Sequence, residues 1–444
     1  MRQRLTAVGA ALLAVAASVL ISARPADAAV GLHIDGESIV EANGQPFIMR
    51  GVNHPHVWYQ GETAAFSDIK ALGANTLRVV LGSGKRWGPS TDVADVVARC
   101  KQNRLICVLE VHDTTGYGEE GAAASLDEAV DYWISQKSAL AGQESYIVIN
   151  IGNEPIGNTD AAQWTAATTA AIQRMRQNGF EHLLMVDAPN WGQDWQYVMR
   201  DNAQTVLDAD SLHNTVLSIH MYAVFSTAAS IVNYLDYFHA RGWPLVIGEF
   251  GWHFADGEVD HETILSEANA RGLGYLGWSW SGNTDPILDM ATDFDPARLT
   301  TWGERIFHGA NGIAATAREA TVFGGQPTTP PTTPPTTPPT TPPSGGACTA
   351  TYRVIGEWPG GFQADISVTA GPAAISGWTV TWTYADGQTV SQAWNATVTS
   401  NGAQVTARNV AYNGSLGAGA STSFGLLGTT TGGTGSPALS CAAA

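Results

Sequence analysis

The chain has 444 residues, of which 44% are hydrophobic and only 14% are charged, with 22 basic against 40 acidic side chains. A formal charge of −18 argues against nucleic acid as a partner, because phosphate binding needs a basic face, and it also argues against an anionic membrane surface. The length allows two or three domains with sizeable cores. Fifteen tryptophans suit a protein whose flat indole faces stack on planar or ring-shaped ligands.

The first 28 residues have the pattern of a secretory signal peptide. Arg2 and Arg4 precede a run of small apolar residues, and Ala-Asp-Ala at 26–28 fits the site at which such peptides are cleaved. The alternative is a membrane anchor, but about 17 apolar residues, mostly alanine, lie at the short end for a membrane span. We therefore expect cleavage after Ala28 and a secreted, extracellular protein that does not bind a membrane.

A stretch of proline and threonine divides the rest of the chain. Residues 327–343 contain no other residue type. Proline fixes φ near −65°, so this run should form an extended polyproline II spacer that cannot build a core. The predicted organisation is a large domain at 29–325, a linker at 326–346 and a small domain at 347–444.

The large domain is predicted to be a (β/α)8 TIM barrel of the α/β class. Short apolar, β-branched runs start 29 to 41 residues apart, which leaves room for one helix in each gap. These runs are 47–52, 76–81, 105–111, 146–151, 182–186, 215–219, 244–247 and 274–277. Helical patterns between them include 64–72, 92–102, 125–140, 161–177 and 261–270. An open doubly wound sheet is the alternative, but no glycine-rich phosphate loop follows the first strand.

Polar side chains follow nearly every predicted strand, at the end of the barrel where chemistry takes place. Glu154 follows the fourth run and Glu249 the seventh. Hydrolysis of a glycosidic bond needs an acid that protonates the leaving oxygen and a second carboxylate that faces the anomeric carbon. The pair therefore predicts glycoside chemistry, with retention at a carboxyl separation of about 5–5.5 Å and inversion at about 6.5–9.5 Å. Arg78 is expected to pair with Glu249, whose negative charge is expected to raise the pKa of Glu154.

Two other kinds of site fit the sequence less well. A metal site is the rival interpretation for His54, His56, His112 and His220, but no HExxH or paired-cysteine spacing supports it. A Ser-His-Asp hydrolase would need a G-x-S-x-G elbow, which the sequence lacks. We therefore expect neither a metal nor a cofactor.

Six motifs in order resemble glycoside hydrolase family 5, a retaining family of barrel enzymes, over residues 31–325. They are Leu77-Arg78-Val79, Val111-His112-Asp113, Ile151-Gly152-Asn153-Glu154-Pro155, His220-Met221-Tyr222, Gly248-Glu249-Phe250-Gly251 and Gly277-Trp278-Ser279-Trp280. Further segments look like the bacterial endo-β-1,4-mannanases of that family. They are the stretches at 51–56, 109–118 and 187–192.

The resemblance implies a role for each matching residue. Glu154 would be the acid/base and Glu249 the nucleophile. The implied substrate-binding residues are Arg78, His112, Asn153, His220, Tyr222, Trp278 and Trp58. Among them, Asn153 would bind the 2-hydroxyl of the sugar and Trp278 would be the floor under it. Trp58 is a further sugar platform or a buried loop anchor, and Trp280 is expected to point the other way and pack.

The small domain is predicted to be an antiparallel β-sandwich, rich in glycine, threonine and valine. Trp378 and Trp382 share one face of a strand and are expected in its core. The exposed-turn contexts of three other aromatics predict a flat strip for stacking on a polysaccharide; the alternative is that they fill the core. These aromatics are Trp358, Trp394 and Tyr412. The segment resembles a family 2, cellulose-binding carbohydrate-binding module, with Tyr412 where tryptophan is common.

The four cysteines can form two disulfides in a secreted chain. Cys348 and Cys441 bracket the small domain, and the resemblance includes this pair. Cys100 and Cys107 are a second candidate pair that would connect a helix end to the next strand.

The resemblance implies a monomeric, secreted, retaining endo-β-1,4-mannanase. It would cut internal bonds of mannan, galactomannan and glucomannan, and its small domain would hold it on cellulose in the plant cell wall. The alternative enzyme is an endo-β-1,4-glucanase, because the same catalytic set serves glucose backbones. A binding protein without catalysis is the alternative from another class, but both Glu154 and Glu249 are present.

Overall fold

The computed structural model describes residues 31–254, 257–325 and 347–443, the last range with gaps at 359, 372, 386, 411–412, 418–420 and 431–436. The chain separates into two compact units, Met1–Thr332 and Thr333–Ala444, which are treated one at a time below. The predicted signal peptide 1–28 and the linker 326–346 lie outside the described residues. Among the described residues, no helix is long and apolar enough to cross a membrane.

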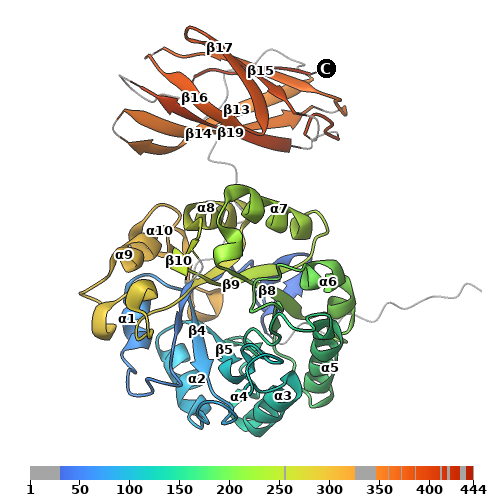
Figure 1. The fold of residues 1–444 in the computed structure, drawn as a ribbon, viewed down its shortest axis with the longest axis vertical. Coiled ribbons are helices and arrows are strands. Elements are labelled where there is room, and N and C mark those ends of the chain that lie inside the picture. The colour runs from blue at the N-terminus through green and yellow to red at the C-terminus, as the bar shows by residue number, and fades with distance from the viewer. Residues whose placement is uncertain are drawn as a thin grey trace, which may run out of the picture. The chain divides into compact units, whose positions relative to one another are not determined.

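The first unit is a closed barrel of eight parallel strands with helices around it, as predicted (Figure 1). Its strands are β3 (Arg50–His54), β4 (Thr76–Leu81), β5 (Ile106–Val111), β6 (Ile147–Asn150), β7 (Leu184–Asp187), β8 (Thr215–Met221), β9 (Leu245–Phe250) and β12 (Gly274–Gly277). β12 pairs with both β3 and β9, which closes the ring. Every predicted strand overlaps an observed one.

Ten α-helices occur in the described part of this unit. They are α1 (Ala65–Ala71), α2 (Val93–Gln102), α3 (Leu126–Ser135), α4 (Lys137–Leu140), α5 (Gln163–Gln177), α6 (Val198–Asp208), α7 (Ala228–His239), α8 (His261–Arg271), α9 (Thr301–His308) and α10 (Ile313–Thr316). The helix predicted at 125–140 is two helices, because Gln136 leaves the helical region at φ −93° and ψ 2°. A capping box between Ser125 and Glu128 fixes its start.

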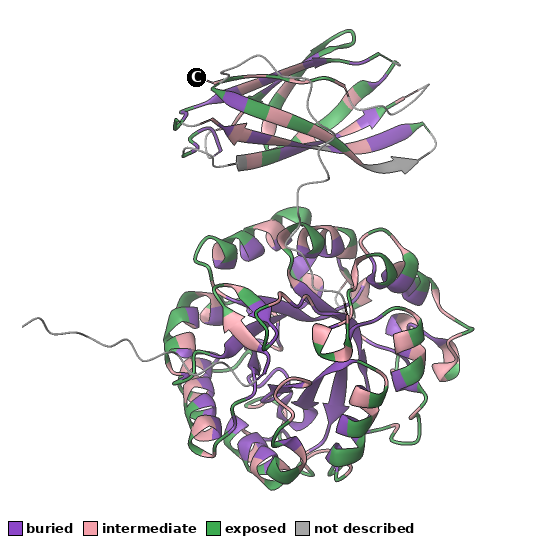
Figure 2. Cartoon of the chain, turned by 180° about the vertical axis from the view of Figure 1, so that it is seen from behind, coloured by how far each residue is buried: buried purple, intermediate pink, exposed green. Residues whose placement is uncertain are grey.

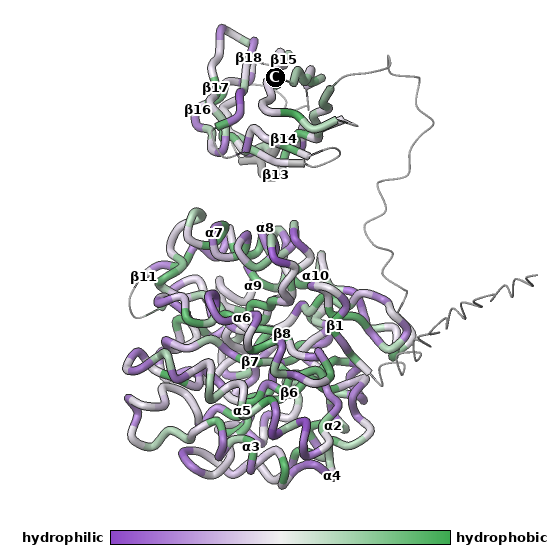
Figure 3. Tube along the Cα trace, turned by 90° about the vertical axis from the view of Figure 1, so that its right-hand side faces the viewer, coloured by the Kyte–Doolittle hydropathy of each residue, from purple (hydrophilic) through white to green (hydrophobic). Residues whose placement is uncertain are grey.

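The strands are buried on both sides, whereas the outer faces of the helices are exposed (Figure 2). Such strands have near-continuous hydrophobic sequences, and Figure 3 shows green, hydrophobic stretches along β6 and β7. A short hairpin, β1 (His33–Asp35) and β2 (Ser38–Val40), adds Ile39, and the residue before it adds Leu32, to the apolar cluster that includes the amino-terminal halves of the barrel strands.

Along the strands, the side chains of one alternating set change from apolar to polar. The apolar members lie in one buried cluster and include Val108, Val148, Met185 and Val216. Two residues further along the same strands, on the same side because successive side chains alternate, come buried polar groups. These are Glu110, Asn150, Asp187 and Ser218. The carboxyl ends of the strands therefore hold a polar, buried layer above an apolar plug.

The second unit consists of two four-stranded antiparallel sheets, ordered β13-β14-β19-β16 and β17-β18-β15-β20. The strands are β13 (Cys348–Trp358), β14 (Gly361–Ala370), β15 (Trp378–Thr383), β16 (Thr389–Trp394), β17 (Ala396–Asn401), β18 (Gln404–Asn409), β19 (Ser421–Thr429) and β20 (Ser440–Ala443). Trp378 and Trp382 are buried in the core, as predicted. The predicted β-sandwich is confirmed.

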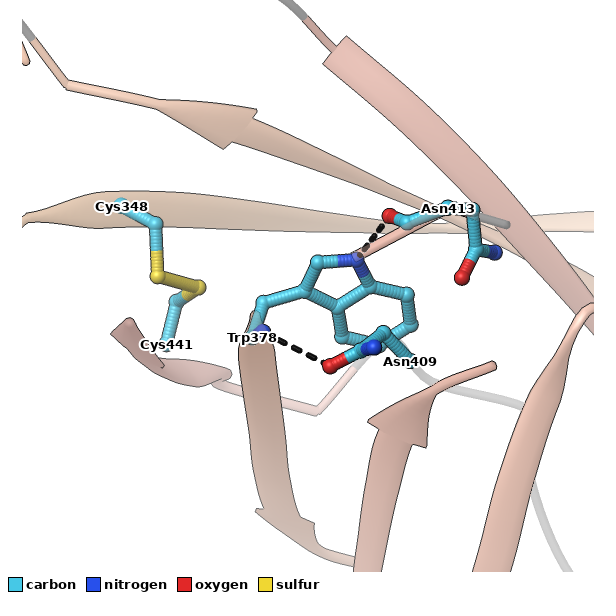
Figure 4. Close-up of a disulfide and its surroundings, with 5 residues drawn as sticks. All are labelled: Cys348, Trp378, Asn409, Asn413 and Cys441. Atoms are coloured by element: carbon cyan, nitrogen blue, oxygen red, sulfur yellow. Dashed lines mark hydrogen bonds between the residues drawn. A yellow bond between two sulfur atoms is a disulfide. The ribbon is translucent and has the colours of Figure 1, made fainter. Parts of the chain in front are cut away.

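Both cysteine pairs are disulfide-bonded. Cys348–Cys441 connects β13 of one sheet to β20 of the other, close to Trp378, whose Nε1 donates to the carbonyl of Asn413 (Figure 4). Cys100 and Cys107, with Cα atoms 6.1 Å apart, connect α2 to β5. A covalent bond between the two sheets offsets the small size of this unit's core.

Candidate active site

The residues predicted to act on substrate lie at the carboxyl ends of the barrel strands or in the loops that follow them, except Arg78, which lies inside β4. Glu154 lies in the loop after β6, and Glu249 lies within β9. One carboxylate oxygen each of Glu154 and Glu249 and one ring nitrogen of His220 are all within 4.8 Å of one another. The structure therefore brings the two predicted carboxylates together. Glu154 has a positive φ of 40°, a strained conformation for a non-glycine residue that aims this side chain into the site.

Glu249 is held by two donors, one on each oxygen. Arg78 Nη1 donates to its Oε1 over 2.8 Å, and the phenol of Tyr222 donates to its Oε2 over 2.8 Å. Both donors are buried, and so is the carboxylate. Its oxygens are therefore oriented and negatively polarised without contact with bulk water.

Arg78 organises the layer from the centre of the barrel. Its Nη2 donates to Asn153 Oδ1 over 2.7 Å and to Asn150 Oδ1 over 2.8 Å. Burial opposes its charge, but Glu110, Asp187 and Glu249 outweigh this and raise the pKa of the Arg78 guanidinium above its usual range. A permanent cation thus lies under the paired carboxylates.

Glu154 has a different environment, in which His220 Nδ1 lies 2.8 Å from its Oε1. Burial is the largest cause that raises the pKa of Glu154 above the usual range, whereas the bonded His220 lowers it and Glu249 raises it further. The sequence-based explanation, in which the partner carboxylate raised this pKa, is therefore wrong about the main cause. Removal of the carboxyl from water does more than its negative neighbour.

The electrostatics around His220 favour its protonated form. Burial lowers its pKa, but the carboxylates of Glu249, Asp187 and Glu154 outweigh burial and raise the pKa to about 10. An imidazolium donates from both nitrogens and has no lone pair for a metal. Glu154, His220 and Glu249 are the one group in the described chain spaced to hold a metal ion, but both oxygens of Glu249 already accept hydrogen bonds from Arg78 and Tyr222, which does not fit that use.

Two other histidines of the rival metal interpretation, His54 and His56, have partners outside this group. His54 packs against Phe66 and Phe294, and its burial lowers its pKa to about 3. His56 Nε2 is 2.8 Å from Asp92. The four histidines therefore do not converge on one point, and each has a separate packing or hydrogen-bonding role.

Aromatic rings form one wall of the site. The rings of His112 and Trp278 are stacked with centroids 5.5 Å apart, and His112 Nδ1 is 2.9 Å from Glu110. Trp58 meets both His112 and Trp87 edge to face at 5.2 Å. With 40% of its surface exposed, Trp58 is not a buried loop anchor. Trp280 is fully buried, as predicted.

Asn153 is placed for hydrogen bonding to a ligand. Its Oδ1 accepts from Arg78, and one proton of its Nδ2 goes to Thr115 Oγ1 over 2.9 Å. Because an amide nitrogen has two protons, the second remains available to a substrate hydroxyl.

Sequence reasoning placed Asn53 and Asp187 in motif segments at strand ends without giving them a role, and it gave no role to Glu110 or Trp87 either. Asp187, Glu110 and Asn53 contact Arg78 or the site histidines, and Trp87 extends the aromatic wall. Glu110 could have been found, because it lies in the predicted strand 105–111, two residues after Val108 and so on the same side, next to the carboxyl end of that strand. Trp87 lies in a loop and has no such signal.

The family model described as "Cellulase (glycosyl hydrolase family 5)" matches residues 40–284. The chain belongs to glycosyl hydrolase family 5. This family 5 member is 55% identical over 303 residues to a mannan endo-1,4-beta-mannosidase of Streptomyces lividans, which covers 67% of this chain and 79% of that protein. It is 47% identical over 327 residues to a protein of the same name from Cellvibrio japonicus, with 72% and 73% covered.

Among solved structures, the chain is similar to the beta-mannanase of Streptomyces thermolilacinus with mannohexaose. The identity is 61% and the TM-score 0.66, and the match covers 66% of this chain and 98% of that one. The described active-site wall and paired carboxylates therefore occur in a chain that shares family and fold with these proteins.

Residues 348–443 match the model described as "Cellulose binding domain". Of the three predicted surface aromatics, Trp394 is 37% exposed, and its indole lies over Gly425 on the adjacent strand. Trp358 belongs to β13, but its side chain is outside what the structure describes, and Tyr412 lies outside the described residues. A side chain at position 425 would collide with the indole, so glycine there lets the ring lie flat on the sheet.

Proposed function

We propose that this chain is a secreted, retaining endo-β-1,4-mannanase that acts on mannan, galactomannan and glucomannan. The observation that supports it most is the approach of Glu154 and Glu249 to within 4.8 Å, with different partners on each. An approach of the nearest oxygens to within 4.8 Å favours the spacing of roughly 5–5.5 Å in retaining enzymes over that of roughly 6.5–9.5 Å in inverting ones.

The two carboxyl groups would share the chemistry in two steps. In the first, Glu249 attacks the anomeric carbon while Glu154 donates its proton to the departing glycosidic oxygen. In the second, Glu154 takes a proton from water, the water attacks the same carbon, and Glu249 leaves. A buried Glu154 with a raised pKa suits the role of proton donor, and a Glu249 bound by two donors suits the role of nucleophile.

The remaining residues would bind the sugar next to the cleaved bond. Asn153 would donate its free amide proton to the 2-hydroxyl, and Trp278 would support the ring face. Trp58 would stack on a sugar further along, since its exposed indole continues the same wall. Arg78 and Tyr222 would orient the nucleophile, and His112 and His220 would line the same subsite.

A mannose backbone is favoured by the relatives, several of which are named as mannanases. An endo-β-1,4-glucanase is the second candidate, because one relative from Caldicellulosiruptor saccharolyticus, 44% identical over 293 residues, is named "Beta-mannanase/endoglucanase A". Reducing-sugar release from locust-bean mannan and from carboxymethylcellulose distinguishes them. Mannan should be the better substrate, and a preference for carboxymethylcellulose would contradict the assignment.

Glu249→Ala is the corresponding test of catalysis. The variant should retain its fold by circular dichroism and lose hydrolysis of mannan. Undiminished hydrolysis would mean that the nucleophile is elsewhere or that the activity is a contaminant.

The small domain would hold the enzyme on cellulose through Trp394, together with Trp358 and Tyr412. Trp394→Ala should lower adsorption to microcrystalline cellulose roughly tenfold, the equivalent of one good stacking contact. Thr397→Ala, an exposed change in the other sheet, is the matched control and should adsorb normally. Equal adsorption of all three proteins would exclude Trp394 from the binding face.

Secretion would follow cleavage after Ala28, and the proline-threonine linker would separate two independently folded domains. The protein would act as a monomer. Amino-terminal sequencing of secreted protein should begin at Ala29, and retention in the cell pellet with an intact amino terminus would contradict this.

A further inference from the structure

Asp187 is a buried carboxylate between His220, which contacts Glu154, and Arg78, which contacts Glu249. The two chemical steps described above give it no role. It is the last residue of β7 and is fully buried. Its Oδ2 lies 3.3 Å from His220 Nε2 and 3.2 Å from Arg78 Nη2, and it accepts the backbone N–H of Glu154 over 3.3 Å. Its Oδ1 accepts from Asn150 Nδ2 over 3.1 Å. It therefore contacts the partner of each catalytic glutamate.

The imidazole of His220 lies between Asp187 and Glu154. Its Nδ1 is 2.8 Å from Glu154, and its Nε2, on the other side of the ring, faces Asp187. Gly192 lies against the ring, and a Cβ at this position would come within 2.6 Å of it. The backbone N–H of His220 also donates to the Gly192 carbonyl over 2.8 Å. The ring therefore has little freedom to turn.

We propose that Asp187 is a positioning residue for the acid/base: it keeps His220 doubly protonated, so that Nδ1–H always points at Glu154. This inference rests on the proposed function, in which Glu154 donates the proton. Because Oε1 of Glu154 accepts this hydrogen bond from His220, the carboxyl proton lies on Oε2, from which it can be donated to the glycosidic oxygen.

The charges around His220 agree with this role. Glu154 faces it from the loop after β6, Glu249 from β9 and Asp187 from β7, while the Arg78 cation lies beyond Asp187 on β4. Burial raises the pKa of Asp187, but His220 and Arg78 outweigh burial and lower it to about 2. Asp187 thus stays negative when Glu154 gains and loses its proton.

Without this negative charge, His220 would tend to be neutral, with a proton on one nitrogen only. If an amide at position 187 accepts from Nε2–H, then Nδ1 presents a lone pair to Glu154. The carboxyl proton would then point at His220 instead of the leaving oxygen. Proton donation would fail while the nucleophile stayed in place.

The test is Asp187→Asn, measured by the pre-steady-state rate of glycosylation with two aryl β-mannobiosides. Dinitrophenolate leaves without a proton, whereas phenolate needs one. The rate with the phenyl substrate should fall about 10- to 100-fold, and the rate with the dinitrophenyl substrate should change by no more than about threefold. An equal fall with both substrates would overturn the proposal, because it would place the effect on the nucleophile or on the fold.

Two controls make the result specific. Asp210→Asn removes another buried carboxylate, which lies outside the site and pairs with Arg176 at 2.7 Å. This variant should leave the ratio of the two rates unchanged. Glu154→Ala should show the same leaving-group dependence as Asp187→Asn. If Glu154→Ala lacks it, the proposed function fails; if only Asp187→Asn lacks it, the role of Asp187 fails alone.

A measurement on the unchanged protein covers the case in which Asp187→Asn does not fold. Nitrogen-15 NMR of histidine-labelled protein, with the His220 signals identified by their loss in His220→Gln, reports both ring nitrogens. Both should be protonated at pH 7. A neutral imidazole at this pH would refute the proposal.

Discussion

Tyr222→Phe removes a single hydroxyl group from the site and should separate the two chemical steps. In the first step Glu249 loses its negative charge as the glycosyl bond forms, and in the second it regains the charge as the bond breaks. The phenol donates to Glu249 Oε2 over 2.8 Å, so it stabilises the carboxylate from which the first step starts and the charge that returns in the second transition state, but stabilises the neutral ester much less. The variant should accumulate the glycosyl-enzyme.

The size of the effect follows from the contact that is lost. His220 Nδ1 lies 3.6 Å from Oε2, which is too far to replace the phenol. A hydrogen bond to a charged group is worth about 1.5–3 kcal/mol. At about 1.4 kcal/mol per factor of ten, deglycosylation should slow by about 10- to 150-fold.

The assay combines a stopped-flow burst with dinitrophenyl β-mannobioside and mass spectrometry of the intact protein. We expect a full burst, a slow steady state, a lower KM and a mass increase of one mannobiosyl group. Tyr234→Phe is the matched control, because Tyr234 is equally buried and donates to Asp194 over 2.7 Å outside the paired carboxylates. It should alter thermal stability only. If Tyr222→Phe slowed both steps alike, the argument from charge on Glu249 would be refuted.

Three further predictions concern the rest of the chain. Trp58→Ala should raise KM for mannohexaose about 2- to 10-fold with kcat nearly unchanged, and a fall in kcat alone would contradict its role as a platform. Cys348→Ser with Cys441→Ser should destabilise the small domain by about 4.6 kcal/mol in urea unfolding, from the entropy of a loop with a sequence separation of 93; a loss below about 1 kcal/mol would contradict this. Two carboxyl groups have a pKa lowered to about 2. For Asp187, His220 and Arg78 outweigh burial, and for Glu262 the cause is the hydrogen bond from Arg305. The stability they supply is therefore complete above the ordinary carboxyl pKa and is lost as the pH falls from about 4 to 2, and a free energy of unfolding that is constant over this range would contradict it.

The sequence was sufficient for the parts of the structure that repeat. The eight strands could be located because each is an apolar run at regular spacing, and Glu154 and Glu249 because they follow such runs. The same reasoning placed Trp378 and Trp382 in the core of the small domain, since they alternate on one face of β15.

The parts that could not be predicted depend on contacts between distant segments. The break at Gln136 has no proline or glycine to mark it. The main cause of the raised Glu154 pKa is burial by the surrounding loops, which no local pattern reports. The bridge from Asp187 to both His220 and Arg78 joins three different strands, so only the closed barrel reveals it.

The covalent role of Glu249 is the central claim, and trapping the intermediate tests it most directly. A 2-deoxy-2-fluoro mannobioside with a dinitrophenyl leaving group should inactivate the enzyme. The fluorine slows both steps, whereas the activated leaving group speeds only glycosylation, so the glycosyl-enzyme accumulates. Peptide mass spectrometry should then find one sugar on the peptide that contains Glu249. A label on another residue, or full activity with no label after prolonged incubation, would contradict the mechanism.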